Sequence, residues 1–597
     1  MPETRRYSTT EIVTLALFFT GCMIFFGVFF KFHIWFIEQL QVFLLTSDHF
    51  STYLSKPAFL SSYIGDFLTQ LYWLNGGGAV VITITLALLW LLLKVLARQI
   101  SRRELPFLLP VLPVVFSWIA LCDLEYPVSN VISLNISVLF VLLYISIKQT
   151  TARRIAGIFL LIHLYAAAGG SMWKFTISAI VFEIFKAENK SRSSYRMLYP
   201  FILLVLSVFV PLASKHFYLL TAGESLTYLS AMKADPDFFD FMPLIMVILM
   251  VILAIIPIRG IRYSMQSAYS KLVQVLLLIA VMVTGILLNA DFNLERIFRM
   301  DYEARMGRWD KVLDLSERYD MHTSLSSYYT NMALSKLGIM PENLMEHYQP
   351  AATGLFIPVN ANENYLTITL SNEVYWHLGD VNAAQHSALL GTIFSPRAAN
   401  SRLMKRIAEI NIINGEYAAA EKYIGILEKT MFHRKWAEDN RKYLFNEDEC
   451  RKPGWITEKR LIIPSNDLLK AGNEYITTLR MLADNHPENR MAVDYLLCFH
   501  LLSKDIDTFI SDFEHYYKTG PGSVLPQVYQ EGLLIKIASG VKSPADYSNF
   551  RFTAEIVSRM ADYTKAFELS NGKGSALIDK YGRTYWFYYH FATMKNE

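Results

Sequence analysis

Long apolar segments dominate the first 290 residues and constrain the fold more than any other feature. About 20 mostly apolar residues cross the hydrocarbon core of a bilayer as a helix. The first run, from about Val13 to Phe30, is of that order and lacks a small-residue cleavage site, so we expect it to remain as a membrane helix. Nine membrane spans are predicted in all: 11–31, 78–97, 105–122, 129–148, 155–170, 171–186, 197–214, 241–258 and 271–289.

Charge divides the chain in two. Residues 1–290 contain 35 Lys, Arg, Asp and Glu residues, whereas residues 291–597 contain 74. This contrast excludes a single soluble globule and a disordered chain, and it predicts a transmembrane domain over 1–290 followed by a second domain of soluble composition over 291–597. The second part is net negative and offers phosphates no basic face, so no nucleic acid partner is expected.

The distribution of basic residues predicts how the chain crosses the membrane. Of the 21 Lys and Arg residues in the first part, 16 fall on one side if the N-terminus is cytoplasmic. These residues form five clusters: Arg5 and Arg6; Lys94, Arg98, Arg102 and Arg103; Lys148, Arg153 and Arg154; Lys186, Lys190, Arg192 and Arg196; and Arg259, Arg262 and Lys271. An odd number of spans then places residues 291–597 outside the cytoplasm. We therefore expect a multi-pass protein of the inner (cytoplasmic) membrane with a periplasmic C-terminal domain.

The first outer segment, 32–77, is long for a loop and is not polar. KFHIWFIEQLQVFLLT and AFLSSYIGDFLTQLYWL both have apolar and aromatic residues at helical spacing. We expect two helices that lie in the membrane interface, because aromatic side chains favour that region.

The second part is predicted to be helical. Three stretches have the plan of a helix, a glycine turn and a second helix, around Gly307, Gly338 and Gly415. The plan is similar to tetratricopeptide-type (TPR-like) helical hairpins, although the spacing between units is irregular. A plain helical bundle without a groove is the alternative. The whole chain is therefore expected to be all-α, with a polytopic membrane bundle before an extracytoplasmic helical-hairpin domain.

Two smaller features of the second part leave alternatives open. Cys450 and Cys498 would pair only in an oxidising compartment, and Cys498 lies in YLLCFHLL, which is typical of a buried helix. The aromatic C-terminus TYWFYYHF (584–591) suits either a sugar- or membrane-contacting surface or a last helix that docks into its own domain.

Glu38 is the first candidate for chemistry. It follows the first span among Phe32, Trp35, Phe36 and Leu40, where a carboxylate is partly desolvated and suits a general base. Its polar neighbours Gln39 and Gln41 are the expected substrate-binding partners. The alternative is an interfacial glutamate that faces water.

Asp123 and Glu125 form a second candidate site in the short loop before Pro127. Two carboxylates two residues apart, just outside a span, can bind a divalent cation such as Mg²⁺ or Mn²⁺, or a basic group. The alternative is a polar cap on a tight turn.

Other ionisable residues near the outer boundary suit an anionic head group. Lys174 follows Gly169-Gly170 inside an apolar stretch, and Lys215 and His216 lie at the outer end of the seventh span. Asp66, in the long first loop, is a further substrate-binding candidate. The alternative for Lys174, and for Glu183 in the same stretch, is a side chain that snorkels toward the interface.

The sequence contains no GxSxG, Walker, HExxH or dinucleotide-binding pattern. It resembles an uncharacterised family of multi-spanning membrane proteins from anaerobic Gram-negative bacteria. The resemblance rests on EQLQVFLLT and GDFLTQLYWLNGGGA after the first span and on GEYAAAEKY in the second part, and it covers nearly the whole chain.

The architecture also resembles GT-C-type membrane glycosyltransferases, including oligosaccharyltransferases. These enzymes have a long outer loop after the first span, an acidic residue at its start, a second acidic site in the next outer loop and a soluble outer domain. Glu38 matches the first acidic position and Asp123 and Glu125 match the second, but the D-x-D pair and the WWDxG-like motif are missing.

The resemblance implies transfer of a sugar or glycan from a polyprenyl-phosphate-linked donor to an exported protein or an envelope glycan. Glu38 would act on the acceptor hydroxyl, Asp123 and Glu125 would hold a cation, and Lys174 or Lys215 would neutralise the phosphate. Two other hypotheses remain: a non-enzymatic membrane-anchored TPR-like scaffold for periplasmic partners, and a lipid or glycan transporter or flippase, for which no inverted repeat is visible.

Overall fold

The structure is a computed structural model that describes residues 9–101, 106, 108–185, 197–228, 238–255, 268–359, 364–465, 474–517, 523–540, 542–548 and 550–593. Within these ranges the regular elements are all helical, as the sequence predicts. The chain divides into two compact units. Unit 1 is Met1–Glu295 with Lys429–Arg434, and unit 2 is Arg296–Glu428 with Lys435–Glu597. The return of 429–434 to unit 1 has no counterpart in the sequence analysis.

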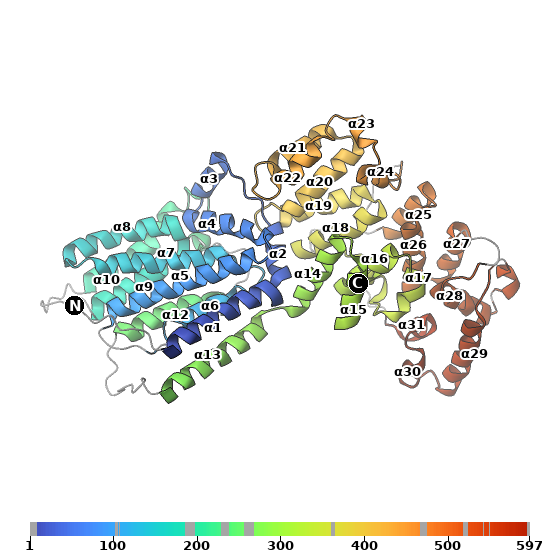
Figure 1. Cartoon of the computed structure of the whole chain (residues 1–597), viewed down its shortest axis with the longest axis horizontal. Helices are drawn as coiled ribbons and strands as arrows, with labels where there is room; N and C mark the ends of the chain where they lie inside the picture. Colours follow the sequence, from blue (N-terminus) through green and yellow to red (C-terminus); the bar gives the residue numbers. More distant parts are fainter. Residues whose placement is uncertain are drawn as a thin grey trace. The chain divides into compact units, whose positions relative to one another are not determined.

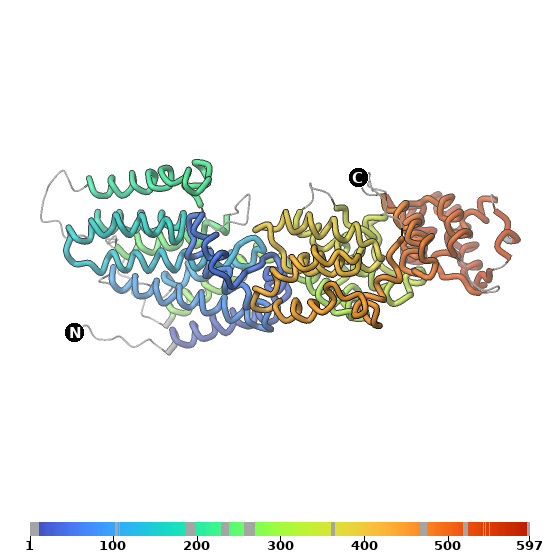
Figure 2. The backbone as a smooth tube through the Cα atoms, turned by 90° about the horizontal axis from the view of Figure 1, so that it is seen from above, coloured from blue at the N-terminus to red at the C-terminus, as the bar shows by residue number. Residues whose placement is uncertain are grey.

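The helices of unit 1 are α1 (Thr9–Ile24), α2 (Lys31–Gln39), α3 (Ser47–Leu54), α4 (Phe59–Thr69), α5 (Gly77–Ile100), α6 (Leu112–Ala120), α7 (Val128–Ser146), α8 (Thr150–Ala168), α9 (Met172–Phe185), α10 (Leu198–Ser214), α11 (Ala222–Thr227), α12 (Phe238–Ile255) and α13 (Ala268–Asn289). A π-helical turn, Phe25–Phe29, extends α1. The long helices run side by side, with α7 packed against α4, α5, α8 and α9 (Figure 1). Seen from above, α5, α7 and α8 keep this alignment (Figure 2).

Six apolar segments of the described residues are long enough to cross a membrane, so the chain is a membrane protein, but the expected number of nine is wrong. The six are Glu11–Phe29, Gly77–Ile100, Val128–Ser146, Thr150–Phe185, Phe238–Ile255 and Tyr269–Asn289. The predicted span 105–122 gives only the nine-residue α6, because Pro106, Pro110 and Pro113 interrupt or delay the helix. The span predicted at 197–214 is the shorter apolar helix α10.

The predicted spans 155–170 and 171–186 lie within one apolar segment that folds back on itself. Gly169, at φ 56°, separates α8 from α9. Glu183 near the end of α9 accepts hydrogen bonds from Arg153 Nε at 2.9 Å and Arg154 Nε at 3.2 Å, both near the start of α8. Tyr144 adds a third hydrogen bond. Glu183 is therefore a buried, paired carboxylate, and the alternative that it snorkels is wrong.

Several basic residues on which the predicted orientation depends lie outside the described residues. They are Arg5, Arg6, Arg102, Arg103, Lys186, Lys190, Arg192, Arg196, Arg259 and Arg262. The orientation of the chain in the membrane therefore stays a prediction.

The α4 helix, predicted to lie in the membrane interface, packs closely on α7. A Cβ atom on Gly65 would lie 2.4 Å from the Cβ of Ser129 and 2.7 Å from its Cα, so only glycine fits this crossing. This contact holds the long first loop against the bundle.

The helices of unit 2 begin within α14 (Phe292–Arg305), which contains the division between the units. They continue as α15 (Trp309–Tyr319), α16 (Ser324–Lys336), α17 (Met340–Asn343), α18 (Tyr365–Leu378), α19 (Val381–Phe394), α20 (Ser401–Asn414), α21 (Tyr417–Leu427), α22 (Arg434–Arg441), α23 (Glu447–Cys450), α24 (Trp455–Arg460), α25 (Tyr475–Asn485), α26 (Arg490–Leu502), α27 (Ile506–Tyr516), α28 (Gln527–Ala538), α29 (Ala554–Leu569), α30 (Ile578–Tyr581) and α31 (Tyr585–Phe591).

Helices of unit 2 that follow one another in the chain pack in pairs, such as α18 with α19 and α20 with α21. The predicted glycine turns are confirmed: Gly307, Gly338 and Gly415 follow α14, α16 and α20, each with a φ between 67° and 78°. Positive φ values of this kind suit glycine at the end of a helix.

The end of the chain docks into its own unit, which decides between the two predicted roles of 584–591. Tyr585 and Trp586 of α31 are fully buried, and Trp586 Nε1 donates to the carbonyl of Glu531 at 2.9 Å. Cys450 and Cys498 are buried free thiols, and Cys498 lies in α26, as its apolar context predicted.

Candidate functional site

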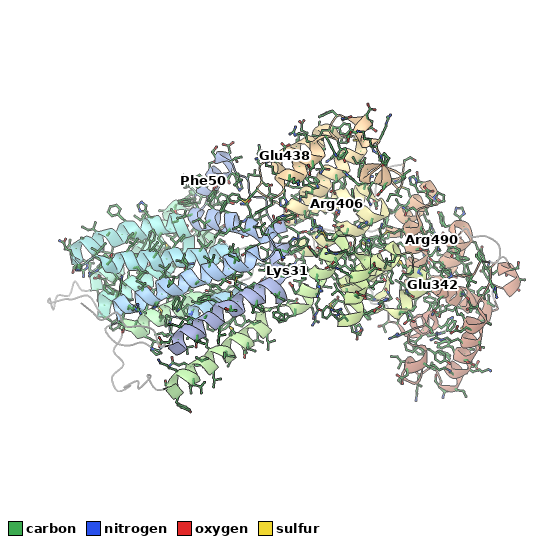
Figure 3. The ribbon with its side chains drawn as sticks, in the orientation of Figure 1. Lys31, Phe50, Glu342, Arg406, Glu438 and Arg490 are labelled. Atoms are coloured by element: carbon green, nitrogen blue, oxygen red, sulfur yellow. The ribbon has the colours of Figure 1, made fainter. Side chains whose placement is uncertain are left out.

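The candidate site forms where α2 ends. The α2 helix begins at Lys31, labelled in Figure 3, and its first free amides are bonded by a residue distant in the chain. Glu295 accepts from the backbone amides of Phe32 at 2.9 Å and His33 at 2.6 Å. A carboxylate at a helix N-terminus satisfies donors that have no partner within the helix. This cap fixes the start of α2 and therefore the position of Glu38 near its end.

The segment 429–434 supplies the other side of the site. The backbone amide of Leu45 donates to the carbonyl of Lys429 at 2.9 Å, which joins this segment to the chain that follows α2. Within the segment, the hydroxyl of Thr430 accepts from the amide of His433 at 3.1 Å. The indole of Trp73 packs edge-on against the imidazole of His433, with ring centroids 5.1 Å apart. These contacts orient the imidazole toward α2.

Glu38 and His433 form a buried carboxylate–imidazole pair. Glu38 Oε1 lies 2.9 Å from His433 Nε2, and the two residues are 3% and 4% exposed. A carboxylate oxygen accepts, so Nε2 carries the hydrogen of this bond. The other polar atoms, Glu38 Oε2 and His433 Nδ1, have no hydrogen-bond partner among the described residues. The alternative that Glu38 faces water is therefore wrong, and the pair retains one unused polar atom on each side.

A small, largely enclosed cavity lies beside the pair. Its volume of about 10 Å³ is close to what one water molecule requires. Its lining comes from α2 and the chain after it, from the end of the first loop and from the segment 429–434: Glu38, Gln41, Val42, Phe43, Gln70, Thr430, Phe432 and His433. Carboxylate, imidazole, amide and hydroxyl groups thus surround a space in which a proton can pass between a bound hydroxyl and the pair.

Gln41 lines the cavity and is positioned by Asp66. Gln41 Nε2 donates to the backbone carbonyl of Asp66 at 3.1 Å. The Asp66 carboxylate accepts from the Tyr53 hydroxyl at 2.7 Å, and the residue is 4% exposed. Gln39 is also buried, but its amide nitrogen bonds the carbonyl of Trp35 at 3.3 Å and it does not line this cavity. Glu38 and Gln41 therefore line one cavity, and Asp66, which does not line it, positions Gln41.

The second pair of predicted carboxylates does not join this cavity. Asp123 and Glu125 are half-buried in the loop between α6 and α7, where Asp123 Oδ1 accepts from the backbone amide of Glu125 at 2.8 Å. That bond is typical of an aspartate-stabilised turn. Among the described residues, no group of three or more His, Cys, Asp or Glu side chains is placed to hold a metal ion. Neither residue lines the cavity beside Glu38.

The three predicted phosphate-binding residues are separate from the cavity as well. Lys174 is buried in α9 and its Nζ donates to the Ser171 hydroxyl at 2.7 Å, so the snorkelling alternative is wrong for it too. Lys215 is half-buried at the end of α10, and His216 beside it is exposed.

Sequence reasoning missed His433, Thr430, Gln70 and Trp73. His433 lies 395 residues from Glu38 in the chain, inside a part that was assigned as a whole to the second domain. Its neighbours carry no apolar run or motif that indicates a return to the membrane unit, so a single sequence holds no signal for it.

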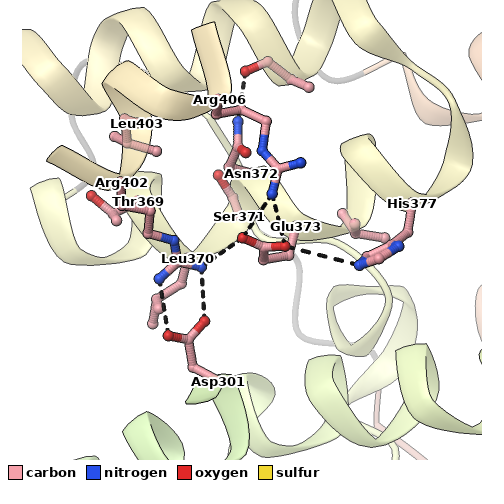
Figure 4. Close-up of polar contacts among 12 residues, drawn as sticks. Asp301, Thr369, Leu370, Ser371, Asn372, Glu373, His377, Arg402, Leu403 and Arg406 are labelled. Carbon is pink, nitrogen blue, oxygen red and sulfur yellow. Dashed lines mark hydrogen bonds and ion pairs between the residues drawn. The ribbon is translucent and has the colours of Figure 1, made fainter. Parts of the chain in front are cut away.

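A second buried polar cluster, in unit 2, is structural. Arg402 donates to both carboxylate oxygens of Asp301 at 2.8 and 2.9 Å and to Glu373 at 2.9 Å, and Arg406 bonds Glu373 at 3.1 Å (Figure 4). Burial alone would raise the pKa of Glu373, but Arg406 and Arg402 hold it well below its usual value. His377 also belongs to the cluster, because its Nε2 lies 3.9 Å from Glu373 Oε2. These charges are compensated within the cluster, which joins α14, α18 and α20.

Comparison with known proteins identifies the family and no activity. A model of DUF6057, a family of unknown function, matches residues 5–592, so the chain belongs to this family. No curated protein and no solved structure matches it.

Proposed function

We propose that this membrane protein is a GT-C-like glycosyltransferase that transfers a sugar or glycan from a polyprenyl-phosphate-linked donor to an exported protein or an envelope glycan. The observation that carries the proposal is the Glu38–His433 pair. It is a buried proton acceptor with an unused carboxylate oxygen on a small polar cavity, in a unit that carries the apolar helices. Orientation in the inner membrane with unit 2 in the periplasm is part of the proposal.

The chemistry that this pair supports is general-base catalysis. The acceptor hydroxyl occupies the water-sized cavity beside Glu38. It loses its proton to the carboxylate as its oxygen attacks the anomeric carbon. The bond between that carbon and the phosphate oxygen breaks, and the polyprenyl phosphate leaves with the electron pair. His433 stabilises the ionised and protonated forms of Glu38 in turn. A positioned base of this kind contributes roughly 10²- to 10⁴-fold to a rate.

The other expected residues enter the proposal unequally. Lys215 and His216, at one end of α10, stay candidates for the donor phosphate. Lys174 is bonded to Ser171, which favours a different role. Asp123 and Glu125 do not line the cavity, so a requirement for Mg²⁺ or Mn²⁺ is tested by the experiment and is not assumed.

The test is rescue of a deletion strain of the host with wild type, Glu38→Gln or His433→Phe. The readout is mass-spectrometric profiling of envelope glycans together with the amount of lipid-linked sugar in the membrane. Wild type is expected to restore a missing glycan, and both variants are expected to restore less than a tenth of it and to accumulate the donor. Asp48→Asn is the matched control, because Asp48 is an exposed acid of the same loop.

Equal rescue by both variants at wild-type expression would refute the proposal. Loss of rescue on chelation of divalent cations, and in Asp123→Asn with Glu125→Gln, would add a metal to the site.

The second candidate function is a membrane-anchored TPR-like scaffold for periplasmic partners. It is favoured by the paired helices of unit 2 and by the buried Asp301–Arg402–Glu373 cluster that joins three of them. If Glu38→Gln and His433→Phe rescue fully while a chain lacking unit 2 does not, the scaffold function replaces the transferase.

A further inference from the structure

The turn between α8 and α9 contains a serine and a lysine in direct contact. Ser171 is the last residue of the turn Gly169–Ser171, and α9 begins at Met172. Lys174 follows three residues after Ser171, a spacing that places the two side chains on one face of the helix start. Lys174 Nζ donates to Ser171 Oγ at 2.7 Å.

Two serines of α7 fix the position of this pair. The Ser133 hydroxyl bonds the Ser171 hydroxyl and also donates to the carbonyl of Ala168 at 2.9 Å. The Ser137 hydroxyl donates to the Ser171 carbonyl at 3.0 Å. Ser171 is fully buried and Lys174 is 7% exposed, so the surrounding residues restrict both side chains.

Lys174 has no carboxylate partner within ion-pair distance in the described part of the chain. The other end of the same hairpin differs, because there Glu183 is paired with Arg153 and Arg154. An ammonium in an apolar segment without a counter-charge is costly, and such groups are retained where they have a function. The uncharged amine is the form that such a site accommodates at least cost. That form is also a base.

We propose that Ser171 and Lys174 are a nucleophile–base dyad that cleaves or transfers the acyl group of a carboxylic ester carried by a lipid. A serine at a helix start with a lysine three residues on is the S-x-x-K arrangement in which lysine can activate the hydroxyl. The apolar helices α7, α8 and α9 around the turn favour a lipid ester over a water-soluble substrate.

The reaction uses only these groups and water. Lys174 Nζ takes the proton of Ser171 Oγ while Oγ bonds to the ester carbonyl carbon. The tetrahedral intermediate collapses with cleavage of the bond to the alkoxy oxygen, which leaves as an alcohol after it takes the proton from Lys174. Water then attacks the acyl-serine with Lys174 again as base, and the carboxylic acid leaves as Ser171 regains its proton. An acceptor alcohol in place of water gives acyl transfer.

A short segment, Thr221–Tyr228, covers the turn. The Gly170 amide donates to the Tyr228 carbonyl at 2.6 Å, and the indole of Trp173 donates to the Leu226 carbonyl at 2.9 Å. This cover, which includes α11, explains why Ser171 is not exposed. Displacement of the segment is the step that admits the ester.

The test is covalent labelling of the full-length protein in detergent with an alkyl fluorophosphonate, a probe that phosphonylates activated serines with loss of fluoride. Peptide mass spectrometry is expected to find the adduct on Ser171, with none in Ser171→Ala. Labelling of Lys174→Met and Lys174→Arg is expected to be at least 10-fold slower, since methionine has no basic nitrogen and arginine does not deprotonate. Trp173→Phe, which loses the bond to Leu226, is expected to be labelled faster.

The matched control is Ser178→Ala, a buried serine of the same helix whose hydroxyl makes no hydrogen bond within the described residues, which is expected to label like wild type. The elution volume and thermal midpoint of each variant establish that it is folded. Absence of a Ser171 adduct on folded wild type overturns the proposal, and so does a Lys174→Arg variant that is labelled at the wild-type rate. If a variant does not fold, the site of the adduct on wild type decides alone.

Discussion

Glu531 couples the docking of the C-terminal helix to pH. It is a 1% exposed residue of α28, and its carboxylate accepts from the backbone amide of Tyr585 at 2.6 Å and from Gln527 Nε2 at 3.1 Å. Burial raises the pKa of this carboxyl to about 7, against the lowering effect of these bonds and of Arg559, while Glu346 raises it further. The folded chain therefore holds a proton here that the unfolded chain has lost.

The direction of the pH dependence follows from this difference in protonation. Below the ordinary pKa of 4.5 both states are protonated and the stabilisation is fully present, and it is lost as pH rises through about 7. At about 1.4 kcal/mol per pH unit, the interval from 4.5 to 7 corresponds to about 3 kcal/mol of docking free energy. We expect α31 to open roughly 100-fold more often at pH 8 than at pH 5.

Replacement of Glu531 by glutamine removes the titration. The amide oxygen still accepts from Tyr585, and Gln527 can turn its own amide to accept from the new NH₂ group. At pH 8 the Glu531→Gln variant is expected to hold α31 about 2 kcal/mol more tightly than wild type.

The assay is hydrogen exchange with mass spectrometry on peptides that cover α31, in the full-length protein, between pH 5 and 8 and corrected for the intrinsic exchange rate. Glu555→Gln, an exposed acid at the start of α29, is the control and should follow the wild-type profile. A flat wild-type profile, or a Glu531→Gln variant that keeps the wild-type slope, would refute the reasoning.

Two substitutions test the packing and the buried charges by thermal unfolding in detergent. Gly65→Ala places a methyl group 2.4 Å from Ser129 Cβ, and the expected loss of about 1–3 kcal/mol should lower the thermal midpoint. Arg402→Leu leaves Asp301 and Glu373 short of their main counter-charge in a buried site, and we expect a loss of about 3–5 kcal/mol or failure to fold.

Each of these has a control in the same chain. Gly223→Ala meets no atom within 4 Å and should leave the midpoint unchanged. Arg441→Leu removes a partly exposed pair with Glu428, which is worth well under about 1 kcal/mol. A Gly65→Ala variant as stable as wild type would show that α4 does not pack against α7 as closely as described.

The apolar segments were readable from the sequence because length and composition define a membrane helix. The number nine was too high for local reasons: prolines shorten α6, and the predicted span 197–214 is a shorter apolar helix, α10. Glycine turns in unit 2 were predictable as well, because few residues other than glycine adopt a positive φ without strain. These features all depend on neighbours in the chain.

The site divides in the same way. Glu38, Gln41 and Asp66 belong to one continuous loop, and their chemistry was visible in its composition. The place of His433 in the site could not be predicted, because it depends on one contact across 395 residues, which a single sequence does not record. The Ser171–Lys174 contact has the spacing of a known pattern, but only the fold around Gly169 shows that no carboxylate of the described residues lies within ion-pair distance of the lysine.

The same separation in the chain has a consequence for biosynthesis. At about 5–20 residues per second, translation reaches His433 some 20 to 80 seconds after Glu38. During that interval the spans enter the bilayer, while Glu38 still lacks its partner His433 and its cavity lacks the lining that the segment 429–434 supplies. A nascent or truncated chain can therefore carry an inserted first unit without a finished site, and the Glu38–His433 pair, unlike the membrane helices, is completed only late in synthesis.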